Sequence, residues 1–165
     1  MFLLLQMAAI LISYVVLYFA FPWFFRTSQR VPGQQFLRSL FTIVVLMAII
    51  LAIAFNVPND FWANRIQHAF LGAFIMSFIC FRAVKDTGVS IDPIRFFLIS
   101  GMLVTTLGVT GEMLEFFFHS LGYHVFSYSI EDTWWDLLSN AVGATIGGLL
   151  FAPFIPLEKA DSGVE

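Results

Sequence analysis

Ionisable and amide side chains interrupt three otherwise apolar stretches of the chain. These stretches are NRIQH (64–68), GEMLE (111–115) and DTWWDLLSN (132–140). Carboxylate and carboxamide oxygens suit Mg²⁺, Mn²⁺ or Ca²⁺, and an added imidazole also admits Zn²⁺ or Fe²⁺. We therefore predict a divalent metal site formed by the histidine and the carboxylates of these stretches: His68, Glu112, Glu115, Asp132 and Asp136.

Acid–base chemistry is a second interpretation of the same residues. Neighbouring ionisable groups change one another's proton affinity, and a general acid or base requires such a change. On this interpretation the catalytic residues are Glu115, His68 and Asp136, acting on a lipid or undecaprenyl-linked headgroup at the outer leaflet. The other polar residues of the predicted site are Asn64, Arg65 and Asn140. For Asp132, capping of a helix N-terminus is an alternative role.

The elements that carry these residues are predicted to be membrane-spanning helices. Of 165 residues, 59% are hydrophobic and 12% are charged, whereas about a quarter of a soluble domain is charged. A helix needs ~20 apolar residues to cross the membrane, and the alternating pattern of a membrane β-barrel is absent. We predict an all-α fold, a polytopic transmembrane helical bundle of about five spans that forms a single integral membrane domain over residues 1–165. The spans are expected at roughly 2–24, 36–56, 63–82, 95–119 and 133–155.

Helical phase places the polar residues on faces that also carry small side chains. At about 100° per residue, three of the spans have such a stripe. The stripes are Asn64, His68 and Gly72 on the third span, Gly101, Thr105, Gly108, Glu112, Glu115 and His119 on the fourth, and Asp136, Asn140, Gly143 and Gly147 on the fifth. Small residues let helix backbones approach closely in a membrane. We infer that the three stripes face one another and that their polar ends frame a cavity.

Basic residues indicate the orientation in the membrane. Of the eight Lys and Arg residues, only Arg65 is assigned to one side. The others fall on the opposite side: Arg26, Arg30, Arg38, Arg82, Lys85, Arg95 and Lys159. By the positive-inside rule, the N-terminus is outside and the C-terminus is cytoplasmic, in a bacterial inner (cytoplasmic) membrane. The apolar N-terminus has neither a basic start nor a small-residue cleavage site, so we expect an anchor rather than a signal peptide.

The three polar stretches resemble those of the VanZ-like and YjdF-like membrane proteins. Asp136-x-x-x-Asn140-x-x-Gly143 is similar to the VanZ-like signature, and Asp132-Thr133-x-x-Asp136 with Glu112-x-x-Glu115 is similar to the YjdF-like one. The resemblance covers roughly residues 60–150. A VanZ-like chain would have Asp-Lys and Glu-x-x-Gln where this chain has Asn64-Arg65 and Glu112-x-x-Glu115. For the VanZ-like branch, the resemblance implies a link to glycopeptide tolerance at the cell envelope.

Several function classes are excluded, and three stay open. The chain has no G-x-S-x-G motif of a serine hydrolase, no phosphate-binding glycine loop and no basic aromatic surface for nucleic acid. Because its helices are predicted to span a membrane, membrane lipids are the expected partners. The first open class is a site that binds a cation or acts on a headgroup. The second is a structural or assembly subunit of a membrane complex, in which the polar residues form a buried network. The third is a small transporter, which at this size would function as a homo-oligomer.

Overall fold

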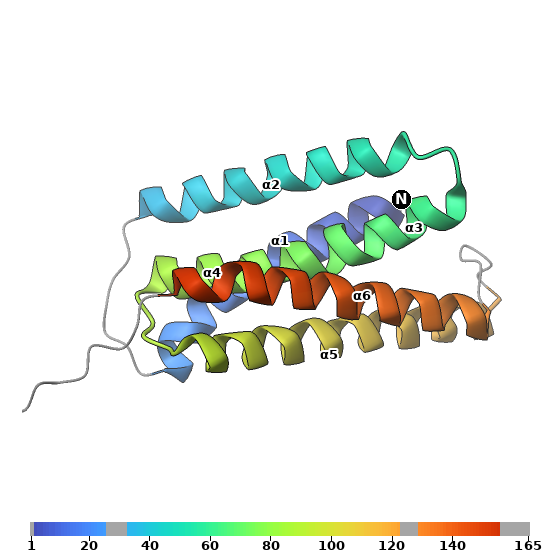
Figure 1. Cartoon of the computed structure of the whole chain (residues 1–165). Helices are drawn as coiled ribbons and strands as arrows, with labels where there is room; N and C mark the ends of the chain where they lie inside the picture. Colours follow the sequence, from blue (N-terminus) through green and yellow to red (C-terminus); the bar gives the residue numbers. More distant parts are fainter. Residues whose placement is uncertain (1, 26–32, 123–128, 156–165) are drawn as a thin grey trace, which may run out of the picture.

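The computed structural model describes residues 2–25, 33–122 and 129–155, and this part of the chain is helical without strands (Figure 1). Five helical segments are long and apolar enough to cross a membrane, so the predicted all-α bundle of five spans is confirmed. The elements in chain order are α1 (Phe2–Phe24), α2 (Gly33–Phe55), α3 (Asp60–Ile66), η1 (Gln67–Phe74), α4 (Ile75–Thr87), α5 (Pro93–Ser120), α6 (Ile130–Phe151) and the 3₁₀ turn η2 (Ala152–Phe154).

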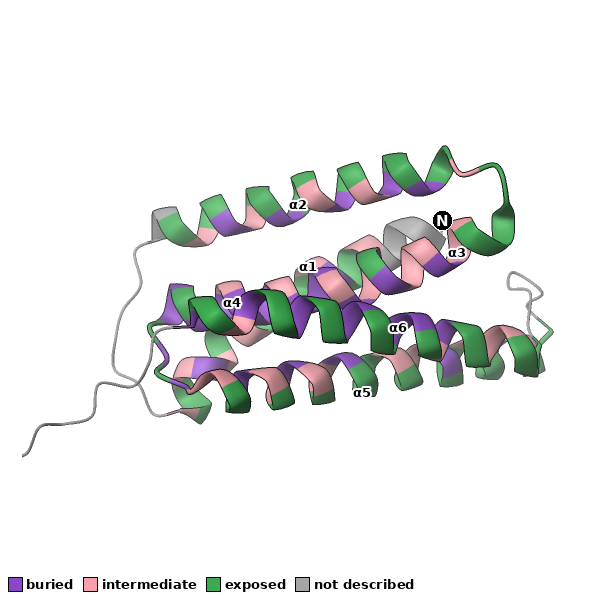
Figure 2. Cartoon of the chain, in the orientation of Figure 1, coloured by how far each residue is buried: buried purple, intermediate pink, exposed green. Residues whose placement is uncertain are grey.

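The third span is the central helix of the bundle. It consists of α3, the π-helical segment η1 and α4, which follow one another without a break. More than half of this span is buried (56%), against 17–33% of each of the others, because α1, α2, α5 and α6 all pack against it. Figure 2 shows exposed residues along the outer sides of α2, α5 and α6. Polar groups placed on the third span are therefore the ones best shielded from lipid.

The central helix is longer than the predicted span of 63–82. It begins after Asn59, whose side-chain oxygen accepts a hydrogen bond from the Trp62 backbone N–H at 3.3 Å. It ends at Gly88, whose left-handed backbone (φ 64°) suits a residue without a Cβ. As a consequence, Arg82 and Asp86 lie within the last turns of α4 rather than in the following connection.

The predicted small-residue face of α6 packs against the central helix. A Cβ atom at Gly143 would overlap the backbone carbonyl of Ala69 in η1, so the two backbones are in contact. One turn further, a Cβ at Gly147 would lie 2.6 Å from the Ser77 Cβ. The structure thus confirms the close approach predicted for this face of the fifth span.

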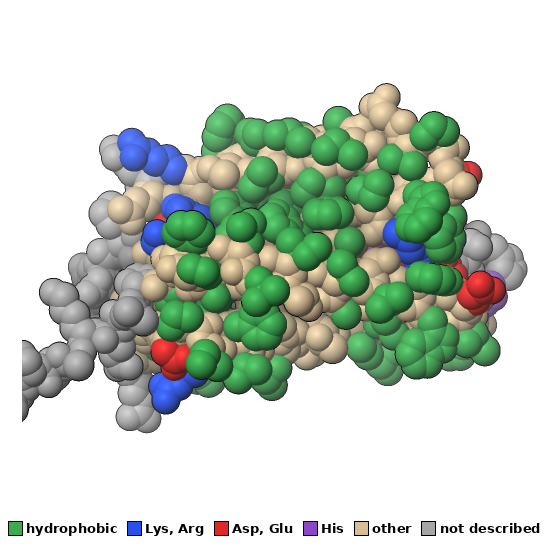
Figure 3. Space-filling view, in the orientation of Figure 1, with side chains coloured by type: hydrophobic (Ala, Val, Ile, Leu, Met, Phe, Trp, Pro, Cys, Tyr) green, Lys and Arg blue, Asp and Glu red, His purple; other side chains and the backbone are tan. Residues whose placement is uncertain are grey.

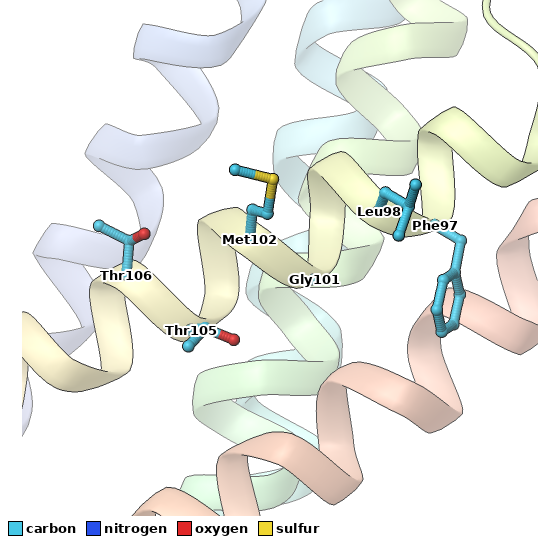
Figure 4. A pocket seen from close by; sticks show the side chains of 6 residues that line it. All are labelled: Phe97, Leu98, Gly101, Met102, Thr105 and Thr106. Atoms are coloured by element: carbon cyan, nitrogen blue, oxygen red, sulfur yellow. The ribbon is translucent and has the colours of Figure 1, made fainter.

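The stripe predicted on the fourth span packs only in its second half. Gly108 and Glu112 of α5 face the bundle, but Thr105 is exposed and a Cβ at Gly101 would meet nothing within 4 Å. The prediction that Gly101 and Thr105 contact a neighbouring helix is therefore wrong. The reason is Phe97, whose ring lies against Gly148 of α6 and occupies the place of a close backbone contact. The result is an open groove of about 380 Å³, lined by Phe97, Leu98, Gly101, Met102, Thr105 and Thr106 (Figure 4).

Charged side chains lie towards the two ends of the bundle, and hydrophobic ones cover its middle (Figure 3). We call the end formed by the start of α3, the end of α5 and the start of α6 the site end. The opposite end is the basic end, where Arg38, Lys85 and Arg95 lie. The predicted basic residues Arg26, Arg30 and Lys159 lie outside the described residues.

A buried polar network near the basic end was not predicted from the sequence. The carboxylate of Asp86, which is 2% exposed, accepts hydrogen bonds from the Tyr14 hydroxyl at 3.0 Å and from the Ser39 hydroxyl. Arg82 Nη2 donates to the other oxygen of Asp86 at 2.8 Å, and Arg82 Nε donates to Ser39 Oγ at 2.8 Å. Because each carboxylate oxygen has a donor, the network joins α1 and α2 to α4 without leaving the charge unpaired.

Candidate functional site

Three helices bring ionisable side chains together at the site end. The central helix contributes Arg65 and His68 just after its capped start, and α5 contributes Glu112 about two turns before its end. On α6, the Ser129 hydroxyl accepts a hydrogen bond from the Asp132 backbone N–H at 3.0 Å, so the helix begins there. This cap places Asp132 and Asp136 on the first two turns of α6.

Arg65 forms the main ion pairs of the site. Its Nη1 donates to Asp136 Oδ1 at 2.6 Å and to the Asp132 backbone carbonyl at 3.1 Å, while its Nη2 pairs with the Asp132 carboxylate. The guanidinium also lies over the ring of Phe61, 4.9 Å from its centroid, and Phe61 packs edge-on against Trp135. The side chain is only 7% exposed, so this arginine links the start of the central helix firmly to α6.

Asp136 is the residue at which most of these contacts meet. Besides Arg65, its Oδ1 accepts a hydrogen bond from Asn64 Nδ2 at 3.3 Å and lies 3.2 Å from His68 Nε2. The Asp136 carboxylate is almost fully buried, with 4% of the side chain exposed. Its hydrogen-bond and ion-pair partners therefore all come from the start of the central helix: Asn64, Arg65 and His68, each of which the sequence predicted to belong to the site.

A group suited to a metal ion forms on the inner side of this cluster. His68, Glu112 and Asp136 each offer one ligand atom, and these atoms lie within 4.8 Å of one another. Ligand atoms on opposite sides of an ion at ~2.0–2.6 Å would be about 4–5 Å apart, so one ion could contact all three. The three residues come from three different helices.

The other two predicted metal ligands have different surroundings. Asp132 is paired with Arg65 and is 29% exposed. Glu115 lies one turn beyond Glu112 on α5, is partly buried, and is not part of the three-residue group. The structure thus divides the predicted set into a compact group of three and two carboxylates at its margin.

Below this three-residue group lies a second layer of residues. One turn deeper than Asp136 on the same face of α6 is Asn140, which is 8% exposed. It lies between two glycines: a Cβ at Gly108 would be 3.0 Å from Asn140 Nδ2, and a Cβ at Gly72 would be 3.3 Å from Asn140 Oδ1. Gly72 follows His68 by four residues, and Gly108 precedes Glu112 by four, so each helix contributes one residue to each layer.

The π-helical segment η1 helps the central helix present this face. In an ordinary α-helix, residues four apart overshoot a full turn by about 40°, so Asn64, His68 and Gly72 would drift around the helix. The wider turn of a π-helix rotates less per residue and reduces this drift. As a result all three residues face α6, where Asn64 and His68 contact Asp136 and Gly72 contacts Asn140. Nothing in the residue pattern indicated this segment.

The charges of the site are not balanced by the side chains themselves. Glu112, Asp132 and Asp136 bring three carboxylates, whereas in the described part of the chain Arg65 is the one guanidinium at the site and pairs with two of them, Asp132 and Asp136. Excess negative charge in a shielded site is costly. A bound cation or protons on the carboxylates would reduce it.

These features define a polytopic α-helical membrane protein with an ionisable cluster at one end of its bundle. The family model of predicted membrane proteins designated DUF2238 matches residues 3–155, and the chain belongs to this family. The match does not support VanZ-like membership specifically. No curated protein and no solved structure matches the chain.

Proposed function

We propose that this membrane protein binds a divalent cation through His68, Glu112 and Asp136. Their ligand atoms lie within 4.8 Å of one another, and this proximity is the main support for the proposal. One imidazole nitrogen and two carboxylates leave coordination positions open for water or a substrate oxygen. The excess of carboxylates over guanidinium groups at the site adds a second reason for a cation to bind there.

The basic end gives the direction in which the site faces. By the positive-inside rule, Arg38, Lys85 and Arg95 favour the cytoplasmic side for the basic end, so we expect the site end at the extracytoplasmic boundary of a bacterial inner membrane. Trp62, Trp134 and Trp135 lie at the site end, as expected of aromatic residues at an interface. A cation held at this depth would be within reach of lipid headgroups, so a headgroup is the partner we expect for its open positions.

A structural role is the second candidate, and the ion pairs of Arg65 favour it. Asp132 and Asp136 together use both terminal nitrogens of that guanidinium, which joins α3 to α6 without any ligand. In this role the cluster would fix the register of two helices, as buried polar groups do in some proteins. Removal of Glu112, which is not part of these ion pairs, separates the two candidates.

A transport role has less support from the packing beneath the site. Gly143 of α6 is in backbone contact with Ala69 of η1, and Gly147 is in close contact with Ser77. An ion moving inwards from the site would have to part these two helices along several turns. The arrangement suits a site reached from one side of the membrane.

Metal content of the full-length, detergent-purified protein tests the proposal. Elemental analysis and calorimetric titration with Mn²⁺ and Zn²⁺ should give about one bound ion per chain, and Glu112→Gln should abolish binding while leaving thermal unfolding nearly unchanged. Glu131→Gln, an exposed carboxylate at the start of α6, is the matched control and should bind like the parent. Parent protein that binds neither metal would overturn the proposal, and loss of stability in Glu112→Gln without any bound metal would favour the structural role.

A further inference from the structure

We propose that Asn140 is a fourth ligand of this site, supplying its carboxamide oxygen from the inner side, and that it biases the site towards Mn²⁺ over Zn²⁺. The inference rests on the proposed cation-binding function and adds a ligand and a selectivity to it.

The Asn140 amide has no hydrogen-bond partner among the described residues. The residue is 8% exposed, and within the described residues its side chain makes no hydrogen bond. Neither amide atom is among the fully enclosed side-chain atoms that lack a partner in the described residues, so a molecule or ion of about the size of water can reach the amide. A bound ion, or a water molecule that the ion holds, would satisfy the oxygen of this amide.

The surroundings of Asn140 leave room for the amide. On either side lie Gly72 and Gly108, and a Cβ at these positions would come within 3.3 Å and 3.0 Å of the carboxamide atoms. An added methyl group at Gly108 would require the amide to shift by a few tenths of an ångström. Since these glycines also lie one turn below His68 and Glu112, the space they leave is directly beneath the proposed ligands.

The direction of α6 makes the Asn140 side chain lean towards the proposed cation site. Side chains of an α-helix lean towards its N-terminus, and α6 begins at the site end. Asn140 therefore leans towards Asp136, four residues earlier on the same face. Two residues with this spacing can bind one metal ion, as the paired histidines of H-E-x-x-H helices do.

The fourth ligand changes the chemistry of the set. With Asn140, the site offers one imidazole nitrogen, two carboxylates and one neutral carboxamide oxygen. Carboxylate, carbonyl and water oxygens suit Mn²⁺, whereas Zn²⁺ favours nitrogen and sulfur ligands and is usually four-coordinate. The additional oxygen ligand from Asn140 therefore favours Mn²⁺, which accepts more oxygen ligands than Zn²⁺ does.

The test compares Asn140→Leu and Asn140→Asp in the full-length, detergent-purified protein by calorimetric titration with Mn²⁺ and with Zn²⁺. Asn140→Leu fills the same space without an oxygen, so Mn²⁺ affinity should fall by about tenfold or more and Zn²⁺ affinity by less. Asn140→Asp keeps an oxygen and adds a charge, so it should bind Mn²⁺ more tightly than the parent. Ser139→Ala is the control, because Ser139 is equally buried but donates to the Trp135 carbonyl, and it should leave both affinities unchanged.

The outcomes separate this inference from the proposed function. One outcome is that the parent and Asn140→Leu bind Mn²⁺ equally well while Glu112→Gln does not bind it. In that case Asn140 is not a ligand, although the proposed cation site is supported. If the parent binds no divalent cation, both proposals fall. Should Asn140→Leu not fold, Asn140→Asp decides, since an Mn²⁺ affinity equal to that of the parent would exclude coordination at this position.

Discussion

Gly143 of α6 and Ala69 of η1 are in direct backbone contact, because the space of a Cβ at Gly143 is taken by the Ala69 carbonyl. This contact lies one turn below Asn140 and holds α6 against the central helix under the site. The position of His68 relative to Asp136 therefore depends on a glycine that has no polar function of its own.

Replacement of Gly143 should destabilise the protein. In Gly143→Ala the new methyl group has no space, so α6 and η1 must separate, and overpacking of this kind costs about 1–3 kcal/mol. Thermal unfolding in detergent, followed by tryptophan fluorescence, measures the loss. Gly101→Ala is the matched control: nothing lies within 4 Å of its added Cβ, and alanine is the better helix former, so stability should be equal or higher. Equal unfolding temperatures for Gly143→Ala and the parent would show that the contact is not tight.

Loss of Arg65 should destabilise the protein more than loss of any exposed arginine. Arg65→Gln leaves the buried Asp136 carboxylate without its strongest partner, and an unpaired buried charge costs about 3–5 kcal/mol. The double variant Arg65→Gln with Asp136→Asn removes both charges and should recover part of the stability. Arg95→Gln is the control, because Arg95 pairs with Asp92 at the surface and such pairs contribute about 0–1 kcal/mol. Similar losses in Arg65→Gln and Arg95→Gln would contradict the buried ion pair.

The sequence was sufficient to predict the bundle and the residues that share a buried face of α6, for a physical reason. Apolar runs of about 20 residues have few alternatives to a membrane helix, and helical phase then decides which residues share a face. For that reason Asp136, Asn140, Gly143 and Gly147 were predicted on one side of α6, and the structure buries all four.

Two features could not be predicted from the sequence: the Asp86 network, which depends on where a helix ends, and the packing of Gly101, which depends on one bulky side chain. Because the third span was expected to end at 82, Asp86 lay outside the predicted helix, and its network with Tyr14 was missed. The place of Gly101 was predicted wrongly because the ring of Phe97 keeps α5 away from Gly148. For the Asp86 network, the spacing Arg82-x-x-x-Asp86 was the one available signal in the sequence, since residues four apart on a helix can form an ion pair.

The Asp86 network should be essential for attaching α1 and α2 to the bundle. Asp86→Ala removes the ion-pair partner of Arg82 and the acceptor of the Tyr14 and Ser39 hydroxyls, so the loss of stability should exceed that of any single one of these hydrogen bonds. Tyr14→Phe removes a single hydrogen bond to a charged group and should cost about 1.5–3 kcal/mol. Arg95→Gln is the surface control and should have a much smaller effect, since Arg95 is 73% exposed and its pair with Asp92 is solvated. Unfolding measured for the three variants should follow this order, and an unchanged Asp86→Ala protein would contradict it.

Glu112 and Glu115 should differ in metal binding although they are neighbours on one helix. Glu112 belongs to the three-residue group and Glu115 does not, so Glu112→Gln should abolish binding, whereas Glu115→Gln should weaken it only through the loss of nearby negative charge. Mn²⁺ titration of both variants gives the comparison, and the weaker effect at Glu115 should shrink further at high salt. Equal loss in both variants would mean that the ion lies nearer the end of α5 than the group of three indicates.

The orientation of the chain determines which compartment can supply the cation, and single-cysteine labelling tests it. Cys80 is 1% exposed, and the Cys80→Ala protein provides a cysteine-free background. Pro58→Cys places a thiol on the exposed connection at the site end, and Lys85→Cys places one at the basic end. Since basic residues remain on the cytoplasmic side, a membrane-impermeant maleimide added to intact cells should label Pro58→Cys and reach Lys85→Cys only after lysis. The reverse pattern would put His68, Glu112 and Asp136 on the cytoplasmic side, so that a bound ion would come from the cytoplasm and the outer headgroups could not be its partners.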